Sequence, residues 1–146
     1  MCIRDSFKVV ENTCFRGRWE QLQSSPKVIA DIGHNFEGVK EVVDQLLKQS
    51  YDNLHIVWGM VEDKEVKKVV DLLPADANYY LAAPHISRAM KKAELAKYFE
   101  NRFNFKICSS VREAYEEALK YSGSGDLIFI GGSTFVVAEI ISDFFS

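Results

Sequence analysis

Short apolar runs and longer amphipathic stretches alternate along this chain. The apolar runs are typical of buried strands and lie at 28–32, 55–59, 78–82, 105–108 and 126–130. Between and after them, apolar residues recur every three or four positions, which predicts helices at 39–47, 66–73, 91–100, 111–119 and 136–145. This alternation predicts an α/β fold that is Rossmann-like, with a mostly parallel sheet of about six strands and helices on both faces.

The first predicted strand of the sheet differs from the others. Residues 19–22 (WEQL) mix apolar and polar residues, which favours a strand with one exposed face. A short Ser-Ser-Pro turn at 24–26 connects them to the apolar run at 28–32. Because the turn is so short, we expect these two strands to be antiparallel neighbours.

Three details of the helices follow from the same patterns. Ser110 and Glu113 have the spacing of a capping box at the start of a helix. The apolar stripe at 39, 42, 43, 46 and 47 is expected to be buried in full. The same burial is expected for the stripe of the last helix, at 136, 137, 140, 141, 144 and 145.

The N-terminus shows little sign of structure. Residues 1–6 (MCIRDS) have neither the apolar core of a signal peptide nor the periodicity of a helix, and they resemble translated adapter remnants at the ends of metagenomic gene models. We therefore expect residues 1–14 to be a non-native or linker segment, in which 7–10 form a short strand or a linker tail. The folded domain then spans 15–146, opens with a basic turn at 14–18, and is a fragment of a longer protein.

Composition excludes several functional classes. A chain of 146 residues with 47% hydrophobic content suits one domain with a single core. The net charge of −3 gives no basic footprint for nucleic acid, and no apolar run approaches the ~20 residues that cross a membrane. Three cysteines without C-x-x-C spacing support neither a disulfide framework nor a zinc site, so we expect no metal ligands in this chain and a cytoplasmic location.

Three strand-to-helix junctions carry unusual polar or glycine content: DIGHN at 31–35, GMVEDK at 59–64 and GGST at 131–134. In a parallel sheet all three lie at the carboxyl edge, where helix N-termini present free N–H groups to anions. Each junction has a simpler interpretation on its own. Asp31 and Asn35 suit helix capping, His34 suits a structural hydrogen bond, and the two glycines suit a tight turn.

Taken together with FRGR at 15–18, these segments resemble the C-terminal domain of the folylpolyglutamate synthase/dihydrofolate synthase family, in the Mur ligase superfamily. The resemblance is carried by an upstream G-R, by D-x-x-H-N after a strand, by G-M-x-x-D-K and by a G-S that opens the last helix. Arg16 and Phe36 stand where this family often has proline, so we expect altered loop shapes and unchanged chemistry.

The resemblance implies an ATP-dependent amide ligase that joins L-glutamate to dihydropteroate or a folate through an acyl phosphate. It implies ATP contacts from Arg18, Asp31, His34 and Asn35. Lys64 is implied to act with His34 in catalysis, and Lys64 and Ser133 are implied to face the incoming glutamate.

The implied ATP site is incomplete in this sequence. No G-x-x-G-K-[ST] segment is present, and the family holds its phosphate loop and Mg²⁺ ligands in an N-terminal domain. We therefore expect a covalently linked N-terminal ATPase domain and no activity from this chain alone. Two alternatives stay open. One is a domain of a cell-wall Mur ligase, which usually has a different glycine-rich loop at 59–64. The other is a stand-alone nucleotide-binding module without ligase activity.

Overall fold

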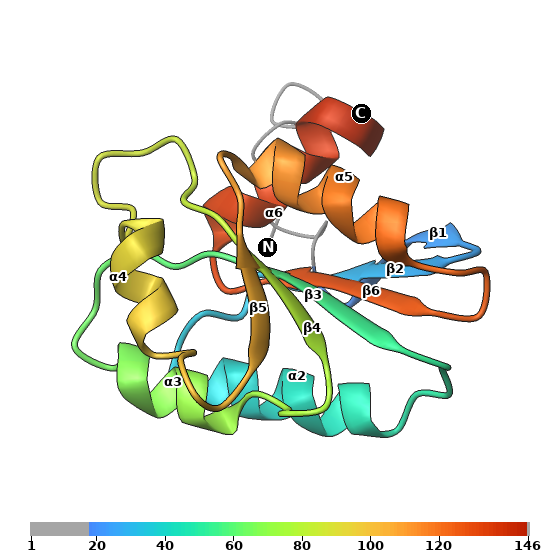
Figure 1. Cartoon of the computed structure of the whole chain (residues 1–146), viewed down its shortest axis with the longest axis horizontal. Coiled ribbons are helices and arrows are strands. Elements are labelled where there is room, and N and C mark those ends of the chain that lie inside the picture. The colour runs from blue at the N-terminus through green and yellow to red at the C-terminus, as the bar shows by residue number, and fades with distance from the viewer. Residues whose placement is uncertain (1–17, 146) are drawn as a thin grey trace, which may run out of the picture.

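Six strands form one sheet in the order β1-β2-β6-β3-β4-β5 (Figure 1). The computed structural model describes residues 18–145, so the predictions for residues 1–14 and for the turn at 14–17 lie outside the described part. In chain order the strands are β1 (Glu20–Ser24), β2 (Lys27–Ala30), β3 (Leu54–Trp58), β4 (Asn78–Leu81), β5 (Asn104–Ile107) and β6 (Leu127–Gly131). β1 is antiparallel to β2 as predicted, and every other neighbouring pair is parallel.

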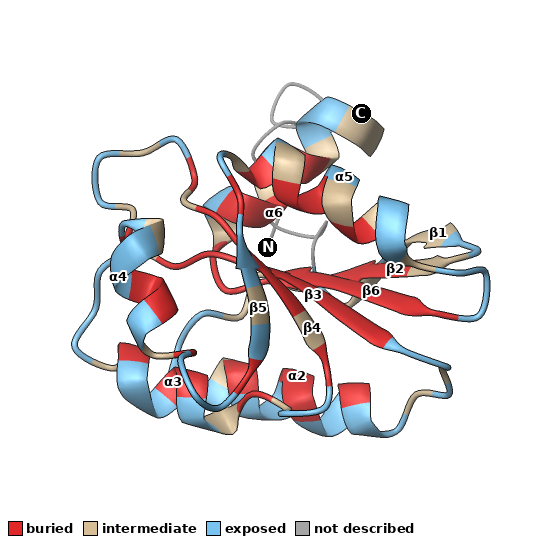
Figure 2. Ribbon diagram, viewed as in Figure 1, coloured by how far each residue is buried: buried red, intermediate tan, exposed pale blue. Residues whose placement is uncertain are grey.

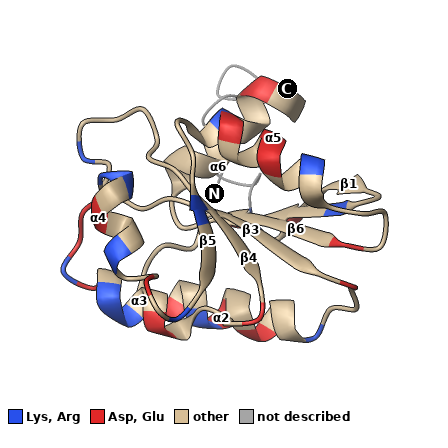
Figure 3. Cartoon of the chain, viewed as in Figure 1, with Lys and Arg blue, Asp and Glu red and all other residues tan. Residues whose placement is uncertain are grey.

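Helices cover both faces of the sheet, which confirms the predicted α/β architecture (Figure 1). The first face carries α2 (Phe36–Leu47), α3 (Val66–Leu72) and α4 (Lys92–Lys97). The second face carries α5 (Val111–Tyr121), α6 (Thr134–Ile140) and a π-helical turn, η2 (Ile141–Phe145). Acidic and basic residues alternate along the outer sides of α2 and α3, which are solvated (Figure 3).

The core is divided by the sheet into two apolar layers. β3 and β6 are buried at every position, as expected for parallel strands that are covered on both faces (Figure 2). Ile29, Ile56 and Phe129 belong to the layer under α2, α3 and α4. Val57 and Ile130 belong to the layer under α5 and α6. Because side chains alternate between the faces along each strand, both layers are built from the same short runs.

Two predicted stripes are less buried than expected. Leu47, the last residue of α2, is 62% exposed, because it lies on the flank of the stripe where the helix ends. Ile141, Phe144 and Phe145 are only half-buried, because the α-helix gives way to a π-helical turn after Ile140. The rings of Phe144 and Phe145 pack against a buried aromatic of α5, with centroids 4.7 and 6.0 Å from that of Tyr115.

The N-terminus of α5 is capped much as the predicted capping box requires, but one of its two hydrogen bonds is shifted by one residue. The Ser110 hydroxyl accepts a hydrogen bond from the N–H of Glu113 at 3.0 Å. The Glu113 carboxylate accepts from the N–H of Ser109 at 2.6 Å, not from that of Ser110. Two N–H groups at the start of the helix are thereby satisfied, as in a capping box.

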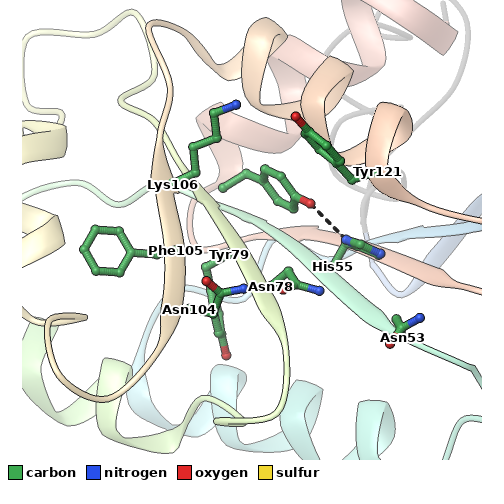
Figure 4. Close-up of a pocket in the computed structure, with 9 residues that line it drawn as sticks. Asn53, His55, Asn78, Tyr79, Asn104, Phe105, Lys106 and Tyr121 are labelled. Carbon is green, nitrogen blue, oxygen red and sulfur yellow. Dashed lines mark hydrogen bonds between the residues drawn. The ribbon is translucent and has the colours of Figure 1, made fainter.

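A buried polar network closes the amino edge of the sheet. Asp126 accepts hydrogen bonds from His55 Nε2 (2.9 Å), Asn53 N (3.1 Å) and Gly123 N (2.9 Å). Burial acts to raise the pKa of Asp126, but these hydrogen bonds outweigh it and hold that pKa below its ordinary value. On its other side, His55 Nδ1 lies 3.0 Å from the Tyr80 hydroxyl, and burial raises the pKa of Tyr80 to about 12. Because the Asp126 carboxylate accepts from Nε2–H, Nδ1 of a neutral His55 ring is the acceptor and the Tyr80 hydroxyl donates the hydrogen bond to it (Figure 4).

At the carboxyl ends of β3 and β6, the backbone lies too close to neighbouring segments to admit a side chain. A Cβ at Gly59 would lie 2.3 Å from the carbonyl oxygen of Ala82. Gly132 has a φ of +97°, and a Cβ there would lie 2.4 Å from the carbonyl oxygen of Gly59. Only glycine fits both positions, so the two glycines let the junctions at 59–64 and 131–134 pack against each other.

Gly59→Ala is expected to lower the free energy of unfolding by about 1–3 kcal/mol, because the backbone around Ala82 must move to admit the methyl group. Gly123→Ala is the matched control, since no atom lies within 4 Å of a Cβ at that position. Urea unfolding of both variants measures the difference. Equal stability of the two variants would show that the close approach is absent.

Asp126→Asn is expected to cost about 1–3 kcal/mol at pH 7, because it removes a charged acceptor that the buried His55 ring shares with two backbone N–H groups. A carboxylate with a depressed pKa stabilises the fold above its unfolded pKa, and this contribution disappears as the pH falls through the folded value. The gap between wild type and variant should therefore shrink in urea titrations below about pH 4. Asp52→Asn, at an exposed position nearby, is the control. A gap that does not depend on pH would contradict this account.

Candidate functional site

The three junctions singled out in the sequence lie side by side at the carboxyl edge. Strand β6 lies between β2 and β3, and all three strands run in parallel. Their exits at 31–35, 131–134 and 59–64 therefore open onto one edge of the sheet, as predicted.

A pocket of about 290 Å³ lies at the exit of β2, against the first turns of α2. It brings together four of the predicted site residues, which come from the segment just before β1 and from the β2–α2 junction. The lining residues are Arg18, Asp31, Ile32, Gly33, His34, Asn35, Gly38, Glu41, Val42, Gln45 and Thr134. Its volume is at the lower end for small-molecule sites, which suits one part of a larger binding site.

Asp31 holds the wall of this pocket in shape. One carboxylate oxygen accepts from Trp19 N at 2.9 Å, and the other accepts from Gly33 N at 2.7 Å. Burial raises the pKa of Asp31, although both hydrogen bonds and the charge of Arg18 act to lower it. The carboxylate thus joins the start of β1 to the exit of β2, and this positions Arg18 next to the pocket.

Asn35 and His34 lie at the N-terminus of α2. Asn35 is the N-cap, and its Oδ1 accepts from Gly38 N at 2.8 Å, which confirms the capping interpretation for this residue. Its side-chain NH₂ group is left for other partners. His34 is exposed, and its ring has only a long contact of 3.5 Å to the carbonyl of Ile32. The ATP-binding roles of both residues stay predictions.

Lys64 and Ser133 are not part of this pocket. Lys64 is exposed on the loop between β3 and α3. Ser133 is only 2% exposed, and its hydroxyl accepts from Phe135 N at 3.1 Å as the N-cap of α6. The next residue, Thr134, lines the pocket in its place. The predicted contacts of Lys64 and Ser133 with glutamate therefore stay predictions.

A fourth loop also reaches this edge, and the sequence patterns did not predict it as part of the site. The β4–α4 loop pairs with the β3–α3 loop through two backbone hydrogen bonds, from Glu62 N to Arg88 O (2.9 Å) and from Met90 N to Met60 O (2.8 Å). Arg88 is exposed, and within residues 18–145 its guanidinium has no ion-pair partner. The only sign of Arg88 in the sequence is a basic residue at a further strand-to-helix junction, and this residue belongs to no motif of the resemblance.

The described residues show neither a metal cluster nor a membrane span. No group of three or more His, Cys, Asp or Glu side chains within 18–145 is arranged to hold a metal ion. Over the same residues, every helix is too short or too polar to cross a bilayer.

Several curated proteins match most of this chain. A probable bifunctional folylpolyglutamate synthase/dihydropteroate synthase of Haloferax volcanii is 31% identical over 133 residues, which are 89% of this chain and 16% of the relative. A dihydrofolate synthase/folylpolyglutamate synthase of Buchnera aphidicola subsp. Acyrthosiphon pisum is 28% identical over 139 residues, which are 92% of this chain and 33% of the relative. The chain thus spans a third or less of the length of these relatives.

Solved structures share the fold. The folylpolyglutamate synthase of Mycobacterium tuberculosis, complexed with ADP, superposes with a TM-score of 0.82 at 23% identity, over 89% of this chain and 32% of that one. The family model for the Mur ligase, glutamate ligase domain, matches residues 17–134. That match covers most of the chain and includes the junctions at the carboxyl edge. The chain therefore belongs to the Mur ligase family, of which it carries the glutamate ligase domain.

Proposed function

We propose that this chain is the C-terminal domain of an ATP-dependent ligase that adds L-glutamate to dihydropteroate or a folate through an acyl phosphate. The observation that carries the proposal is the pocket that gathers Arg18, Asp31, His34 and Asn35 at one edge of the sheet. The names of the curated relatives support the choice of substrates.

The pocket has the chemistry that half of an ATP site requires. The Arg18 guanidinium can neutralise charge on the transferring phosphoryl group. Each oxygen of Asp31 has accepted one backbone hydrogen bond and retains a lone pair for a ribose hydroxyl. His34 and the N-terminus of α2 can donate hydrogen bonds to the phosphates. The M. tuberculosis enzyme of the same fold holds ADP in its solved structure, which supports a nucleotide as the ligand.

The incoming glutamate needs cations for its two carboxylates. We infer that Lys64 and Arg88 supply them, because the paired loops at the carboxyl edge present both side chains to solvent. Ser133 contributes by ordering the start of α6 next to the pocket. A solved folylpolyglutamate synthase/dihydrofolate synthase with Mn, AMPPNP and L-glutamate bound shares this fold, which supports a common site for these ligands.

The remainder of the site belongs to a second domain. We infer a covalently linked N-terminal ATPase domain that carries the phosphate loop and the Mg²⁺ ligands, since the chain spans a third or less of the length of its curated relatives. The small pocket on this domain then becomes one wall of an interdomain site. In this arrangement the chain alone performs no ligation.

Arg18→Ala in the full-length ligase is expected to lower glutamate ligation by about 100-fold or more, because charge on the phosphoryl group is no longer neutralised. Asp31→Ala should have a comparable effect, since it removes both the ribose contact and the support of the pocket wall. Turnover with saturating ATP, glutamate and folate measures the loss. Arg102→Ala, an exposed arginine paired with Asp71, serves as the control and should retain wild-type turnover. Near wild-type turnover in both pocket variants would refute the site assignment.

The isolated 146-residue chain is expected to bind AMPPNP weakly or not at all, because it supplies only one wall of the site. Calorimetric titration separates this proposal from a stand-alone nucleotide-binding module. Micromolar affinity in the isolated chain would favour the stand-alone module and count against the ligase half-site.

A further inference from the structure

The β4–α4 loop, residues 82–91, leaves the sheet at its carboxyl edge (Figure 1). It carries Arg88, which the proposed function assigns to a carboxylate of the incoming glutamate. A surface loop has no sheet ladder of its own, so contacts from neighbouring elements decide how well its side chains are placed. The contacts that hold this loop therefore determine where Arg88 lies.

One side of the loop is held by the β3–α3 loop. An isolated antiparallel bridge joins Val61 to Ala89, next to the two backbone hydrogen bonds described above. Ala89 N also donates to Ile86 O at 3.2 Å, so residues 86–89 form a turn with Arg88 at its third position. These contacts fix the turn from its C-terminal side only.

The N-terminal side of the turn is held by a carboxylate of α6. Glu139 Oε2 accepts a hydrogen bond from His85 N at 2.5 Å, and Glu139 Oε1 lies 3.3 Å from His85 Nδ1. One side chain thus holds the backbone and the ring of a single loop residue. An exposed ion pair alone is worth little, but a charged acceptor on a backbone N–H also restricts the chain. The Glu139 side chain is 24% exposed and that of His85 79%, so the carboxylate is the fixed partner.

Helix α6 connects this contact to the proposed ATP pocket. The helix begins at Thr134, which lines that pocket, and it is anchored in the core by Val136, Val137 and Ile140. Glu139 lies near its other end and reaches the β4–α4 loop. One anchored helix therefore borders the pocket at its start and holds the loop of Arg88 near its end.

We propose that Glu139 is a positioning residue for the glutamate substrate, and that it acts through Arg88 rather than by contact with the substrate. It holds His85, and with it the turn at 86–89, so that Arg88 is already placed for a carboxylate. A guanidinium on an unrestrained turn loses more conformational entropy when it binds, so the contact with Glu139 favours binding. The inference rests on the proposed function, in which Arg88 binds glutamate.

The test measures the KM for glutamate of the full-length ligase at saturating ATP and folate. Arg88→Ala is expected to raise this KM about tenfold, because a charge-assisted hydrogen bond to the substrate is lost. Glu139→Ala should raise it about fivefold and change kcat and the KM for ATP little, since only the placement of a binding group is lost. Glu139→Gln keeps an acceptor for His85 N and should stay near the wild-type KM.

A double-mutant cycle separates positioning from general destabilisation. If Glu139 acts through Arg88, Glu139→Ala should raise the KM of an Arg88→Ala ligase by less than about twofold. Glu116→Ala removes an exposed carboxylate of α5 that is paired with Arg112, and as the matched control it should keep the wild-type KM. Hydrogen exchange in the 146-residue chain gives a readout without ligation, in which the His85 amide should exchange faster in Glu139→Ala than in Glu116→Ala.

The inference is overturned if Glu139→Ala leaves the KM for glutamate unchanged, or raises it equally with and without Arg88. It is overturned too if the His85 amide exchanges alike in the Glu139 and Glu116 variants. An Arg88→Ala ligase with the wild-type KM also overturns it, because no glutamate ligand would then be positioned. Failure of the proposed function is seen separately, as near wild-type turnover of the Arg18→Ala and Asp31→Ala variants.

Discussion

The parallel pairing of β6 between β2 and β3 is the constraint on which the carboxyl edge depends. It aligns three strand exits that are far apart in the sequence, at 31–35, 59–64 and 131–134. Two glycines make the alignment tight, since any side chain at Gly59 or Gly132 would enter the space of a neighbouring carbonyl. The edge is thus shaped by backbone packing first, and its polar side chains are added to a fixed frame.

Asp31 connects the backbone at this edge to the polar residues of the pocket. A carboxylate that only capped a turn would be exposed, whereas this one is half-buried and holds N–H groups from two separate segments. Its burial raises its pKa, and the neighbouring charge of Arg18 opposes that rise. The charge of Arg18 therefore favours the ionised form of the Asp31 carboxyl group.

The sequence was sufficient for the fold because strand and helix periodicities are strong in this chain. The polar cluster at 31–35 could be recognised because several of its members are adjacent in sequence. Other features depend on tertiary contacts that periodicity does not encode. Ser133 caps the start of α6, so the next residue, Thr134, lines the pocket instead. Arg88 reaches the edge only because its loop forms hydrogen bonds with the β3–α3 loop. The exposure of Leu47 likewise depends on where α2 ends relative to the sheet.

The two edges of the sheet differ in how far their polar groups are satisfied. At the amino edge, Asp126, His55 and Tyr80 form a closed chain of hydrogen bonds, and Lys106 is paired with Glu117. At the carboxyl edge, the His34 ring, the Asn35 amide and the Arg88 guanidinium keep capacity that no described residue uses. Polar groups on a fixed frame lose little further entropy when they bind. An edge of this kind suits the charged ligands of the proposed function, whereas the paired groups of the amino edge stabilise the fold.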